Sequence, residues 1–569
     1  MSIFNYKRRP TLTVDIGGIP LGSRHPIRIQ SMTSTSTMDT EGSIGQIKSI
    51  AQAGASYVRL TAQGVREAEN IGAMRRRLTD EGLHIPLVAD IHFNPKAAMA
   101  AAAVTDKVRI NPGNFVDPGR TFRKITYTDE EYAAELERIG EKLVPLLDLC
   151  RANGTALRIG VNHGSLSDRI MSRYGDTPAG MVESAMEFLR VCVAHDFMQV
   201  AISIKASNTT VMVETVRRLV KAMNDENMHF PLHLGVTEAG DGEDGRIKSA
   251  VGIGTLLAEG IGDTIRVSLS EDPACEVPVA QTLLDHITKR DSATTIDETA
   301  IDGYDFMAPE RMPSRQVGTI GGNAVTAVVA DSDLCGADFV ATADMLTAPS
   351  GNLKYEAIDA ADPVSHHADR LKASPDTVVV LHSRHINAPG QLQAARHALV
   401  KAGVYNPVIM KLEYPDSDAG DVAIKSAADF GSLLLNGHRD GIWLKAPNID
   451  QSRIGAIAFG ILQAARCRIT RTEFISCPGC GRTMFDLQAT VKAVKEATSH
   501  LTGLKIGIMG CIVNGPGEMA DADYGYVGAA AGRISLYKGK QCVEKNIPAE
   551  QAIQRLTELI KSSGDWKDR

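Results

Sequence analysis

The chain has 569 residues, of which 43% are hydrophobic and 23% are charged, and its formal net charge is −7. This composition is typical of a globular protein of two or three domains, and the acidic balance gives no general attraction to nucleic acid or to an anionic membrane. No apolar run approaches the roughly 20 residues that span a bilayer. The first ten residues also lack the apolar core of a secretory signal. We therefore expect a cytoplasmic protein without a membrane or nucleic-acid partner.

Short β-rich runs alternate with helix-length amphipathic segments from the N-terminus to about residue 288. The runs are 27–31, 57–60, 87–91, 107–111, 156–162, 199–205, 232–237 and 264–268. Eight such units in a region of this length are typical of a (β/α)8 TIM barrel, which we predict for residues 1–288. An open doubly wound sheet is the alternative.

Nearly every run finishes with a polar or charged residue where its apolar stretch stops. These residues are Gln30, Arg59, Asp90, His92, Arg109, Asn111, Arg158, Asn162, Lys205, Glu238, Arg266 and Ser268. The C-terminal ends of the strands of a parallel barrel converge on one mouth, where active sites are built. We therefore predict a cation-rich site at that mouth. The alternative is that strand ends simply become polar as they reach solvent.

The remaining sequence predicts two further domains. Residues 289–470 begin with a passage rich in Pro, Gly and Ser and continue as an α/β unit, which we interpret as an inserted barrel-like domain. No comparable cluster of strand-end cations occurs there, so we interpret this domain as a spacer. Residues 471–569 are predicted to form an α+β domain, with helices at 485–499 and 549–561 around a strand at 505–509.

Three of the nine cysteines fall within 35 residues. Cys477 and Cys480 lie on one tight turn, and Cys511 follows a predicted strand and precedes a Gly-Pro-Gly turn that can bring Glu518 back. Three thiolates can fix three corners of a cubane cluster and leave the fourth iron to a weaker, replaceable ligand. A structural zinc site, a redox disulfide between Cys477 and Cys480, and unrelated buried thiols are the alternatives.

Eight strings in the barrel region and both cysteine motifs are individually distinctive. The strings are 26–33, 88–93, 109–114, 158–162, 164–166, 203–207, 232–240 and 260–269. Together they resemble the 4-hydroxy-3-methylbut-2-enyl diphosphate synthases of the methylerythritol phosphate route to isoprenoids. The strings run in that family's order, and the middle region resembles the inserted domain of the family's three-domain form.

The resemblance implies an iron–sulfur oxidoreductase that works on a small phosphorylated substrate. Two electrons from reduced ferredoxin or flavodoxin would convert 2-C-methyl-D-erythritol 2,4-cyclodiphosphate to 4-hydroxy-3-methylbut-2-enyl diphosphate, with loss of water. The implied ligands of one 4Fe–4S cluster are Cys477, Cys480, Cys511 and Glu518. The implied diphosphate contacts are Arg59, Arg109, Arg158 and Lys205. The implied remaining wall of the pocket is Asn111, Asn162, Ser268, Asp90, His92 and Arg266. Glu238 matches the family's acid/base carboxylate.

The residues themselves support this chemistry. Arginine forks bind phosphate bidentately, and the chain has no Gly-rich P-loop that would do this task. Glu238, at a strand end among cations, is our candidate acid; the alternative is a salt-bridge partner that orients Lys205 or an arginine.

Two other functions compete with this one. They are a non-catalytic iron–sulfur electron-transfer module fused to a phosphate-binding barrel, and a pterin-type transferase. If the chain is the synthase, its C-terminal domain has to hinge over its own barrel or over that of a second chain in a homodimer.

Overall fold

The computed structural model describes residues 2–117, 126–512, 515–519 and 521–568, and the chain folds into two compact units. The first unit comprises Met1–Arg9, Arg246–Ile261 and Thr282–Thr470. The second unit comprises Pro10–Gly245, Gly262–Gln281 and Arg471–Arg569. This division differs from the three domains expected from the sequence, whose boundaries stay a prediction.

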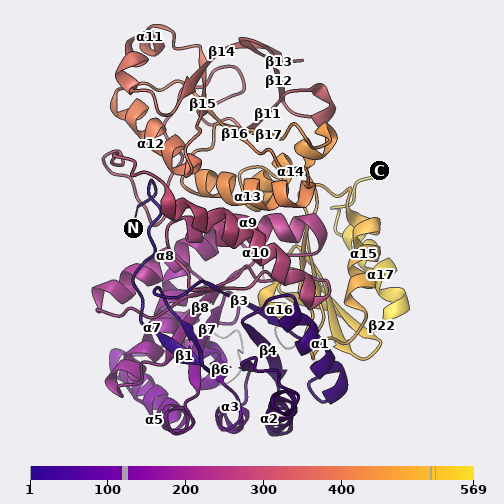
Figure 1. Cartoon of the computed structure of the whole chain (residues 1–569). Helices are drawn as coiled ribbons and strands as arrows, with labels where there is room; N and C mark the ends of the chain where they lie inside the picture. Colours follow the sequence, from indigo (N-terminus) through magenta and orange to yellow (C-terminus); the bar gives the residue numbers. More distant parts are fainter. Residues whose placement is uncertain (1, 118–125, 513–514, 520, 569) are drawn as a thin grey trace. The chain divides into compact units, whose positions relative to one another are not determined.

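The second unit contains a sheet of eight parallel strands in the order β8-β7-β6-β5-β4-β3-β10-β9 (Figure 1). The strands are β3 (Arg28–Met32), β4 (Tyr57–Ala62), β5 (Leu87–Ile91), β6 (Lys107–Ile110), β7 (Ala156–Asn162), β8 (Val200–Lys205), β9 (His233–Leu234) and β10 (Thr264–Ile265). A parallel bridge between Ile202 and Leu232 joins the two ends of the sheet, so the barrel is nearly closed. The predicted TIM barrel is confirmed, and the open doubly wound alternative is wrong.

Helices connect successive strands, as a parallel barrel requires. They are α1 (Thr40–Gln52), α2 (Val65–Asp80), α3 (Pro95–Ala102), α4 (Pro112–Phe115), α5 (Asp129–Asn153), α6 (Asp168–Tyr174), α7 (Pro178–Ala194), α8 (Thr209–Asp225), α9 (Gly242–Ala258) and α10 (Glu276–Thr288). Side-chain caps mark where several of them begin. Thr128, for example, forms a reciprocal capping box with Glu131 at the start of α5.

The register of the barrel strands sets which strand-end side chains are neighbours. Arg109 on β6 is paired with Asp90 on β5 and with Arg158 on β7. Asn162, at the end of β7, is paired with Lys205, at the end of β8. Because paired residues of parallel strands point to the same side of the sheet, these five side chains form adjacent pairs near the mouth.

A hairpin of two short strands covers the opposite end of the barrel. β1 (Val14–Ile16) and β2 (Ile19–Leu21) pair antiparallel, and their side chains pack in one buried cluster with Tyr57, Val88 and Ala156, near the beginnings of β4, β5 and β7. This apolar cluster leaves the C-terminal ends of the strands as the end available for a ligand.

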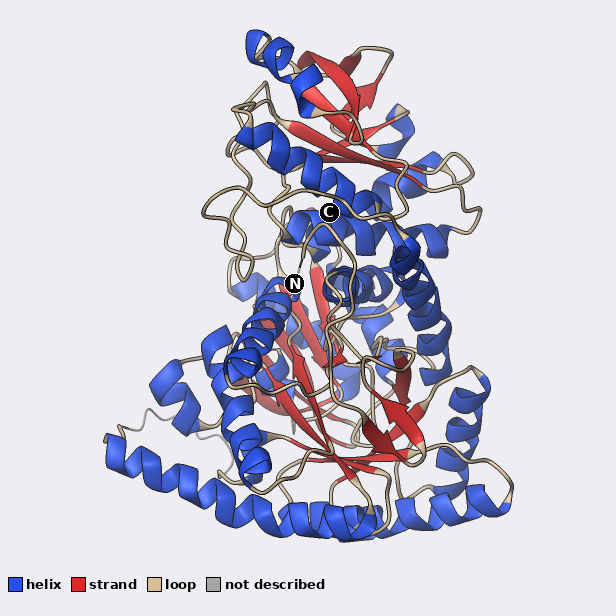
Figure 2. Ribbon diagram, turned by 60° about the vertical axis from the view of Figure 1, so that its left-hand side comes forward, coloured by secondary structure: helices blue, strands red, loops and turns tan. Residues whose placement is uncertain are grey.

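The C-terminal part of the second unit, residues 471–568, is an α+β module, as predicted. Its sheet has the order β18-β19-β20-β21-β22. Figure 2 draws the strands of the chain in red and its helices in blue. The strands are β18 (Glu473–Ser476), β19 (Lys505–Met509), β20 (Tyr524–Ala530), β21 (Arg533–Lys538) and β22 (Gln541–Pro548), and the helices are α15 (Leu487–Thr498), α16 (Gly515–Glu518) and α17 (Ala549–Ser562). β18 and β19 are parallel neighbours, so the loops that follow them begin side by side. Those loops carry Cys477 and Cys511.

The first unit contains another barrel, which is closed and is distinct from the TIM barrel of the second unit. It confirms the predicted barrel-like insert. Its strands are β11 (Ala327–Ala330), β12 (Phe339–Ala341), β13 (Met345–Ala348), β14 (Gly351–Asp359), β15 (Val378–His382), β16 (Val408–Glu413) and β17 (Gly441–Lys445). Its longer helices are α11 (Ala368–Ala373), α12 (Ala388–Lys401), α13 (Ala419–Leu435) and α14 (Gln451–Ala464). Unlike the first barrel it mixes parallel and antiparallel pairs, because β13 pairs antiparallel with both neighbours.

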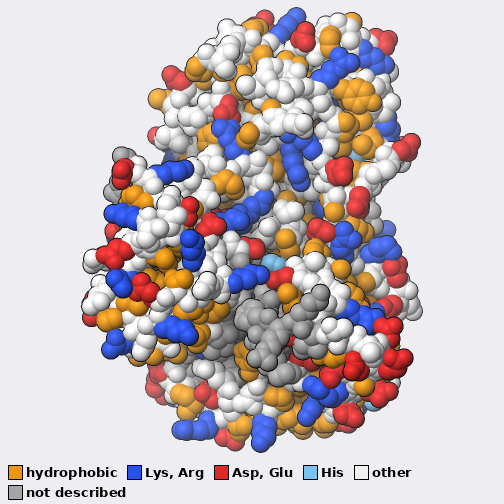
Figure 3. All heavy atoms as spheres, turned by 180° about the vertical axis from the view of Figure 1, so that it is seen from behind, with side chains coloured by type: hydrophobic (Ala, Val, Ile, Leu, Met, Phe, Trp, Pro, Cys, Tyr) orange, Lys and Arg blue, Asp and Glu red, His pale blue; other side chains and the backbone are white. Residues whose placement is uncertain are grey.

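No helix among the described residues is long and apolar enough to cross a membrane. On the face drawn in Figure 3, basic and acidic side chains are interspersed.

One buried carboxylate organises charge inside the first unit. Asp429 on α13 accepts hydrogen bonds from Arg290, from the Tyr414 hydroxyl at 2.8 Å, and is 2.9 Å from Nε2 of His286. Burial alone would raise the pKa of Asp429, but the neighbouring His286 and Arg290 lower it to about 2. The carboxylate is therefore stabilised in its charged form by the fold around it.

We predict that Asp429→Asn destabilises the chain by about 3–5 kcal/mol, because it leaves the buried Arg290 cation without its anion. Asp421→Asn, at a half-buried position on the same helix, should stay within about 0.5 kcal/mol of wild type. Because the pKa of Asp429 is lowered by folding, its contribution is present above pH 4 and is lost as the pH falls toward 2. Urea unfolding of the three proteins at pH 7 and pH 3 tests this, and equal losses for both variants would contradict it.

Candidate active site

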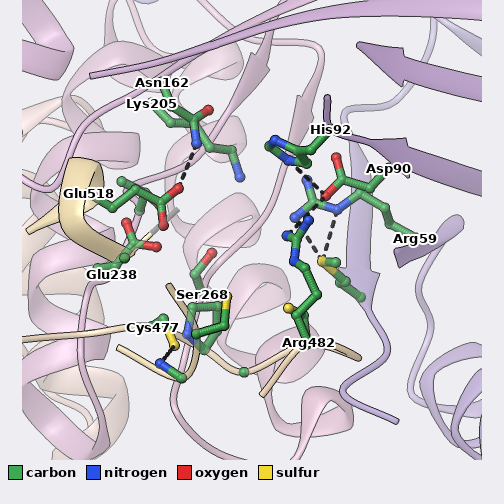
Figure 4. Close-up of a pocket in the computed structure, with 18 of the residues that line it drawn as sticks. Arg59, Asp90, His92, Asn162, Lys205, Glu238, Ser268, Cys477, Arg482 and Glu518 are labelled. Atoms are coloured by element: carbon green, nitrogen blue, oxygen red, sulfur yellow. Dashed lines mark hydrogen bonds and ion pairs between the residues drawn. The ribbon is translucent and has the colours of Figure 1, made fainter. Parts of the chain in front are cut away.

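A cavity lies at the C-terminal ends of the strands of the TIM barrel. Fourteen of the residues predicted from the sequence line it: Arg59, Asp90, His92, Arg109, Arg158, Asn162, Lys205, Glu238, Arg266, Ser268, Cys477, Cys480, Cys511 and Glu518. All of them belong to the second unit. One chain therefore supplies both the barrel wall and the cysteine-bearing wall of the cavity (Figure 4).

Several cations of the barrel wall are buried and form no ion pair within the part of the chain that the structure describes. Arg158 is 1% exposed, and its Nε and Nη1 have no hydrogen-bond partner within the described part of the chain. The side chain of Arg59 donates from Nε and Nη2 to the sulfur of Met32, which is a weak acceptor. Burial lowers the pKa of Arg158 and of Lys205, and the neighbouring cation Arg59 lowers both further. The charge imbalance favours an anionic ligand at this place.

Other charged residues of the wall are already paired. Arg266 forms a bidentate ion pair with Glu276, with distances of 2.9 and 3.0 Å, and therefore has little charge left to offer a ligand. Arg109 donates to Asp90 and to Asn162, each at 3.1 Å, and lies 2.5 Å from Nε2 of His92. These contacts hold the wall in one arrangement.

Glu238 occupies an unusual position between the two walls. Its backbone has φ +47°, a left-handed conformation that is uncommon for a residue other than glycine, and Ala239 forms a parallel bridge with Ser476 of the C-terminal module. Burial raises the pKa of Glu238, and the adjacent Glu518 carboxylate raises it further. Its Oε2 has no hydrogen-bond partner among the described residues. The Glu238 carboxyl group therefore lines the cavity in surroundings that favour its protonated form.

The cysteine wall is built by the parallel strands β18 and β19. Cys477 follows β18, and its sulfur accepts a hydrogen bond of 3.2 Å from the Gly510 amide at the end of β19. Burial raises the pKa of the Cys477 thiol. Gly479 has φ +77°, which turns the chain tightly between Cys477 and Cys480. Three thiols from two adjacent loops thus reach one cavity.

The two walls touch through small residues and short polar contacts. Nδ2 of Asn162 donates to Glu518 at 2.8 Å, and the Ser270 hydroxyl donates to the carbonyl of Cys477 at 2.8 Å. At Gly164, a Cβ atom would lie 2.0 Å from the carbonyl oxygen of Gly517. Only glycine allows this approach, which brings α16 and Glu518 to the mouth of the barrel.

The donor set at the cysteine wall suits an iron–sulfur centre. Three cysteine sulfurs and the Glu518 carboxylate line the same cavity, and a backbone N–H already donates to one of the sulfurs, as is common around clusters. Among the residues that the structure describes, no three His, Cys, Asp or Glu side chains form a group that could hold a single metal ion.

The structure departs from the sequence-based site at two positions. Asn111 does not line the cavity, because the chain turns into α4 at Pro112 and the Asn111 side chain accepts from the Gly113 amide at 3.1 Å as the helix cap. Gln30 also does not line it. The sequence analysis missed further lining residues: Met32, Ser203, Thr237 and Arg482. For Arg482 a signal was available, namely a cation two positions after Cys480.

These features define a class of protein: a TIM-barrel enzyme whose cationic mouth is covered by a cysteine-bearing module of the same chain. Comparison with known proteins agrees. A family model described as the GcpE TIM-barrel domain matches residues 11–281, and one described as the GcpE protein C-terminal domain matches residues 473–562.

Relatives that match over the full length of the chain share one enzyme name, in which either flavodoxin or ferredoxin is given as the electron donor. The chain is 54% identical to 4-hydroxy-3-methylbut-2-en-1-yl diphosphate synthase (flavodoxin) of Parabacteroides distasonis, with 100% of both chains covered. It is 39% identical to the chloroplastic synthase (ferredoxin) of Oryza sativa subsp. japonica, covering 100% of this chain and 89% of the rice protein. A dihydropteroate synthase from Xanthomonas albilineans is 13% identical, covers 50% of this chain and 99% of its own, and has a TM-score of 0.33, too low for any argument.

The chain therefore belongs to the GcpE family of 4-hydroxy-3-methylbut-2-en-1-yl diphosphate synthases. The predicted family, its iron–sulfur oxidoreductase activity and its place in isoprenoid biosynthesis are confirmed. The two competing functions, a non-catalytic electron-transfer module and a pterin-type transferase, do not agree with this membership.

We predict that Gly164→Ala lowers turnover by about 10²-fold, because its Cβ would push Gly517 and Glu518 away from the mouth by an ångström or more. Gly154→Ala is a matched control, since Gly154 also has positive φ but its Cβ would meet nothing within 4 Å. Both substitutions should cost about 1–2 kcal/mol of stability through backbone strain. Steady-state kinetics and thermal unfolding separate the two effects, and equal turnover in both variants would contradict the prediction.

Proposed function

We propose that the cavity binds one 4Fe–4S cluster through Cys477, Cys480, Cys511 and Glu518. The shared cavity and the Gly510 amide bond to Cys477 support this assignment. When bound, such a cluster supplies electrons at low potential and one iron that can act as a Lewis acid. A carboxylate is the ligand of the four that is most easily replaced by a substrate oxygen, so Glu518 marks the side from which a substrate is reached.

We further propose that the cationic mouth holds 2-C-methyl-D-erythritol 2,4-cyclodiphosphate. Arg59, Arg158 and Lys205 are buried and form no ion pair with a carboxylate among the described residues, so the negative charge of the diphosphate would neutralise them. Arg109 contributes through its remaining donor capacity, because its Nε has no partner among the described residues. Asp90, His92, Asn162, Arg266 and Ser268 line the rest of the pocket; Asn111, predicted as a contact, supports the mouth as a helix cap instead.

The reaction balances with two electrons and two protons, counted on the fully protonated compounds. The ring C–O bond and one C–OH bond break, one C=C bond forms, and one oxygen leaves as water. The departing hydroxyl needs a proton, and Glu238 is the proposed donor, because burial and the adjacent Glu518 raise its pKa. Its carboxyl lies between the cationic wall and the cysteine wall, where the hydroxyl would leave.

One observation carries this proposal: unmatched buried cations and the complete cysteine set line the same cavity of a single chain. The electron donor is proposed to be flavodoxin or ferredoxin, the two donors named for the relatives. The cytoplasmic location, the homodimer, the domain hinge and the spacer role of the insert stay predictions.

Replacing Cys511 with serine should abolish or degrade the cluster, because it removes one of three thiolates. Iron and acid-labile sulfide per chain, with the visible absorption of anaerobically purified protein, measure this. Cys275→Ser is the control, because Cys275 is exposed and does not line the cavity. Wild-type iron, sulfide and absorption in Cys511→Ser would exclude Cys511 as a ligand.

Glu238→Gln should lower kcat by roughly 10²–10⁴-fold, the usual weight of general acid–base catalysis, with little change in KM. The cluster should stay at the wild-type level. The surface variant Glu226→Gln should have wild-type kinetics. If Glu238 instead orients a cation, KM would rise while kcat stays near wild type, and the acid assignment would fail.

A further inference from the structure

Arg482 is a cation of the cavity that comes from the cysteine-bearing module and not from the barrel. It follows Cys480 by two residues, is 6% exposed and lines the cavity. Its Nη2 lies 4.0 Å from Oδ2 of Asp90, which belongs to barrel strand β5. Figure 4 shows its side chain reaching from the cysteine wall toward Asp90 and His92.

The surroundings of Arg482 differ from those of the barrel cations. Arg482 lines the same cavity as Cys480 and Cys511, and its Nη2 faces the Asp90 carboxylate at 4.0 Å. Arg59 donates instead to the sulfur of Met32, and Nε and Nη1 of Arg158 have no hydrogen-bond partner among the described residues. Arg482 therefore has an anionic partner in the barrel.

Asp90 links Arg482 to the opposite edge of the same module. Asp90 accepts from Arg109 at 3.1 Å, and Arg109 also donates to Oδ1 of Asn162 at 3.1 Å. Asn162 in turn donates to Glu518 at 2.8 Å. A continuous chain of polar contacts thus begins at Arg482, crosses the barrel mouth, and returns to the C-terminal module at Glu518.

We propose that Arg482 is a positioning residue that couples the cysteine turn to Glu518 through Asp90, and whose charge favours reduction of the thiolate-bound centre. The proposal rests on the function proposed above. Ion pairing with Asp90 aligns the cysteine wall with the barrel cations. The guanidinium also lines the same cavity as the Cys480 and Cys511 sulfurs, where its positive charge would stabilise the negative charge that reduction adds.

Arginine and lysine are not interchangeable at position 482. A guanidinium presents several donors in a rigid fork and can face the thiolates and Asp90 at the same time, whereas an ammonium is a point charge. Nε of Arg482 has no hydrogen-bond partner among the residues described, so one donor remains available toward the cavity. Lysine should preserve the charge but not the alignment.

The test compares Arg482→Met, Arg482→Lys, Asp90→Asn and the Arg482→Met/Asp90→Asn double variant with wild type. The control is Arg533→Met, which removes an exposed arginine on β21 of the same module. Midpoint potentials come from redox titration followed by electron paramagnetic resonance, and kcat and KM from turnover of the cyclodiphosphate. A midpoint potential does not depend on the fraction of protein that carries a cluster, so partial loading does not affect it.

We expect Arg482→Met to have a more negative midpoint potential than wild type and kcat/KM lower by about tenfold. Arg482→Lys should keep a near-wild-type potential while kcat/KM still falls. The effects of Arg482→Met and Asp90→Asn on kcat/KM should be non-additive by at least about twofold, as for residues that interact directly. Arg533→Met should match wild type in every measurement.

Other results would reject either the role proposed for Arg482 or the proposed function. An unchanged potential in Arg482→Met, or additive effects with Asp90→Asn, would reject the coupling role. Complete loss of the cluster in Arg482→Met but not in Arg482→Lys would assign Arg482 to cluster assembly and also reject it. Absence of iron and sulfide from wild type would instead reject the proposed function, so the two failures are distinguishable.

Discussion

The site depends on one electrostatic constraint: cations buried at the mouth of a barrel without a matching anion. Taking guanidinium and ammonium groups out of water is unfavourable unless an opposite charge neutralises them. Arg158 and Lys205 lie in that condition, and their lowered pKa values express it. The β1-β2 hairpin covers the other end of the barrel, so the anion that relieves the imbalance has to enter from the mouth. The folded protein thereby favours an anionic ligand at this mouth.

The close approach of the second wall follows from strand pairing and from glycine. Parallel pairing of β18 and β19 brings Cys477 and Cys511 to one edge of a sheet, and glycines at 164 and 517 let α16 approach the barrel loop. Glu518 then meets Asn162 at 2.8 Å. An oxidoreductase that removes an oxygen from its substrate needs an electron source, a proton donor and groups that hold the substrate. All three have to lie within a few bond lengths of the reacting atoms. The residues proposed for these three roles line one cavity of one chain.

Much of this arrangement could be predicted from the sequence, because it follows from the spacing of the apolar runs and from the polar residues at the strand ends. Apolar runs at regular spacing define a barrel, and strand ends of a barrel converge, so Arg59, Arg109 and Arg158 were expected together. Asn111 follows the same rule but fails, because Pro112 turns the chain into a helix and the amide becomes its cap. The pattern of one strand does not reveal which polar end residue stays in the mouth and which begins the next helix.

Contacts between the two walls were harder to predict, because they join residues more than three hundred positions apart. The hydrogen bond from Asn162 to Glu518 and the ion pair of Arg482 with Asp90 depend on how two separate folding modules meet. The requirement for glycine at positions 164 and 517 becomes apparent only when the opposing backbone is known. The sequence likewise left open whether one chain or two complete the cavity, and the structure has both walls in one compact unit.

The central claim is that one iron of the cluster is bound by the Glu518 carboxylate. This iron faces the anionic ligand that the cations of the barrel mouth bind. Mössbauer spectroscopy of protein reconstituted with ⁵⁷Fe, with and without the cyclodiphosphate, tests it most directly. The account predicts one iron site distinct from three similar ones, and a change confined to that site when the ligand is added. Four equivalent irons that ignore the ligand, or a protein that takes up no iron, would contradict it.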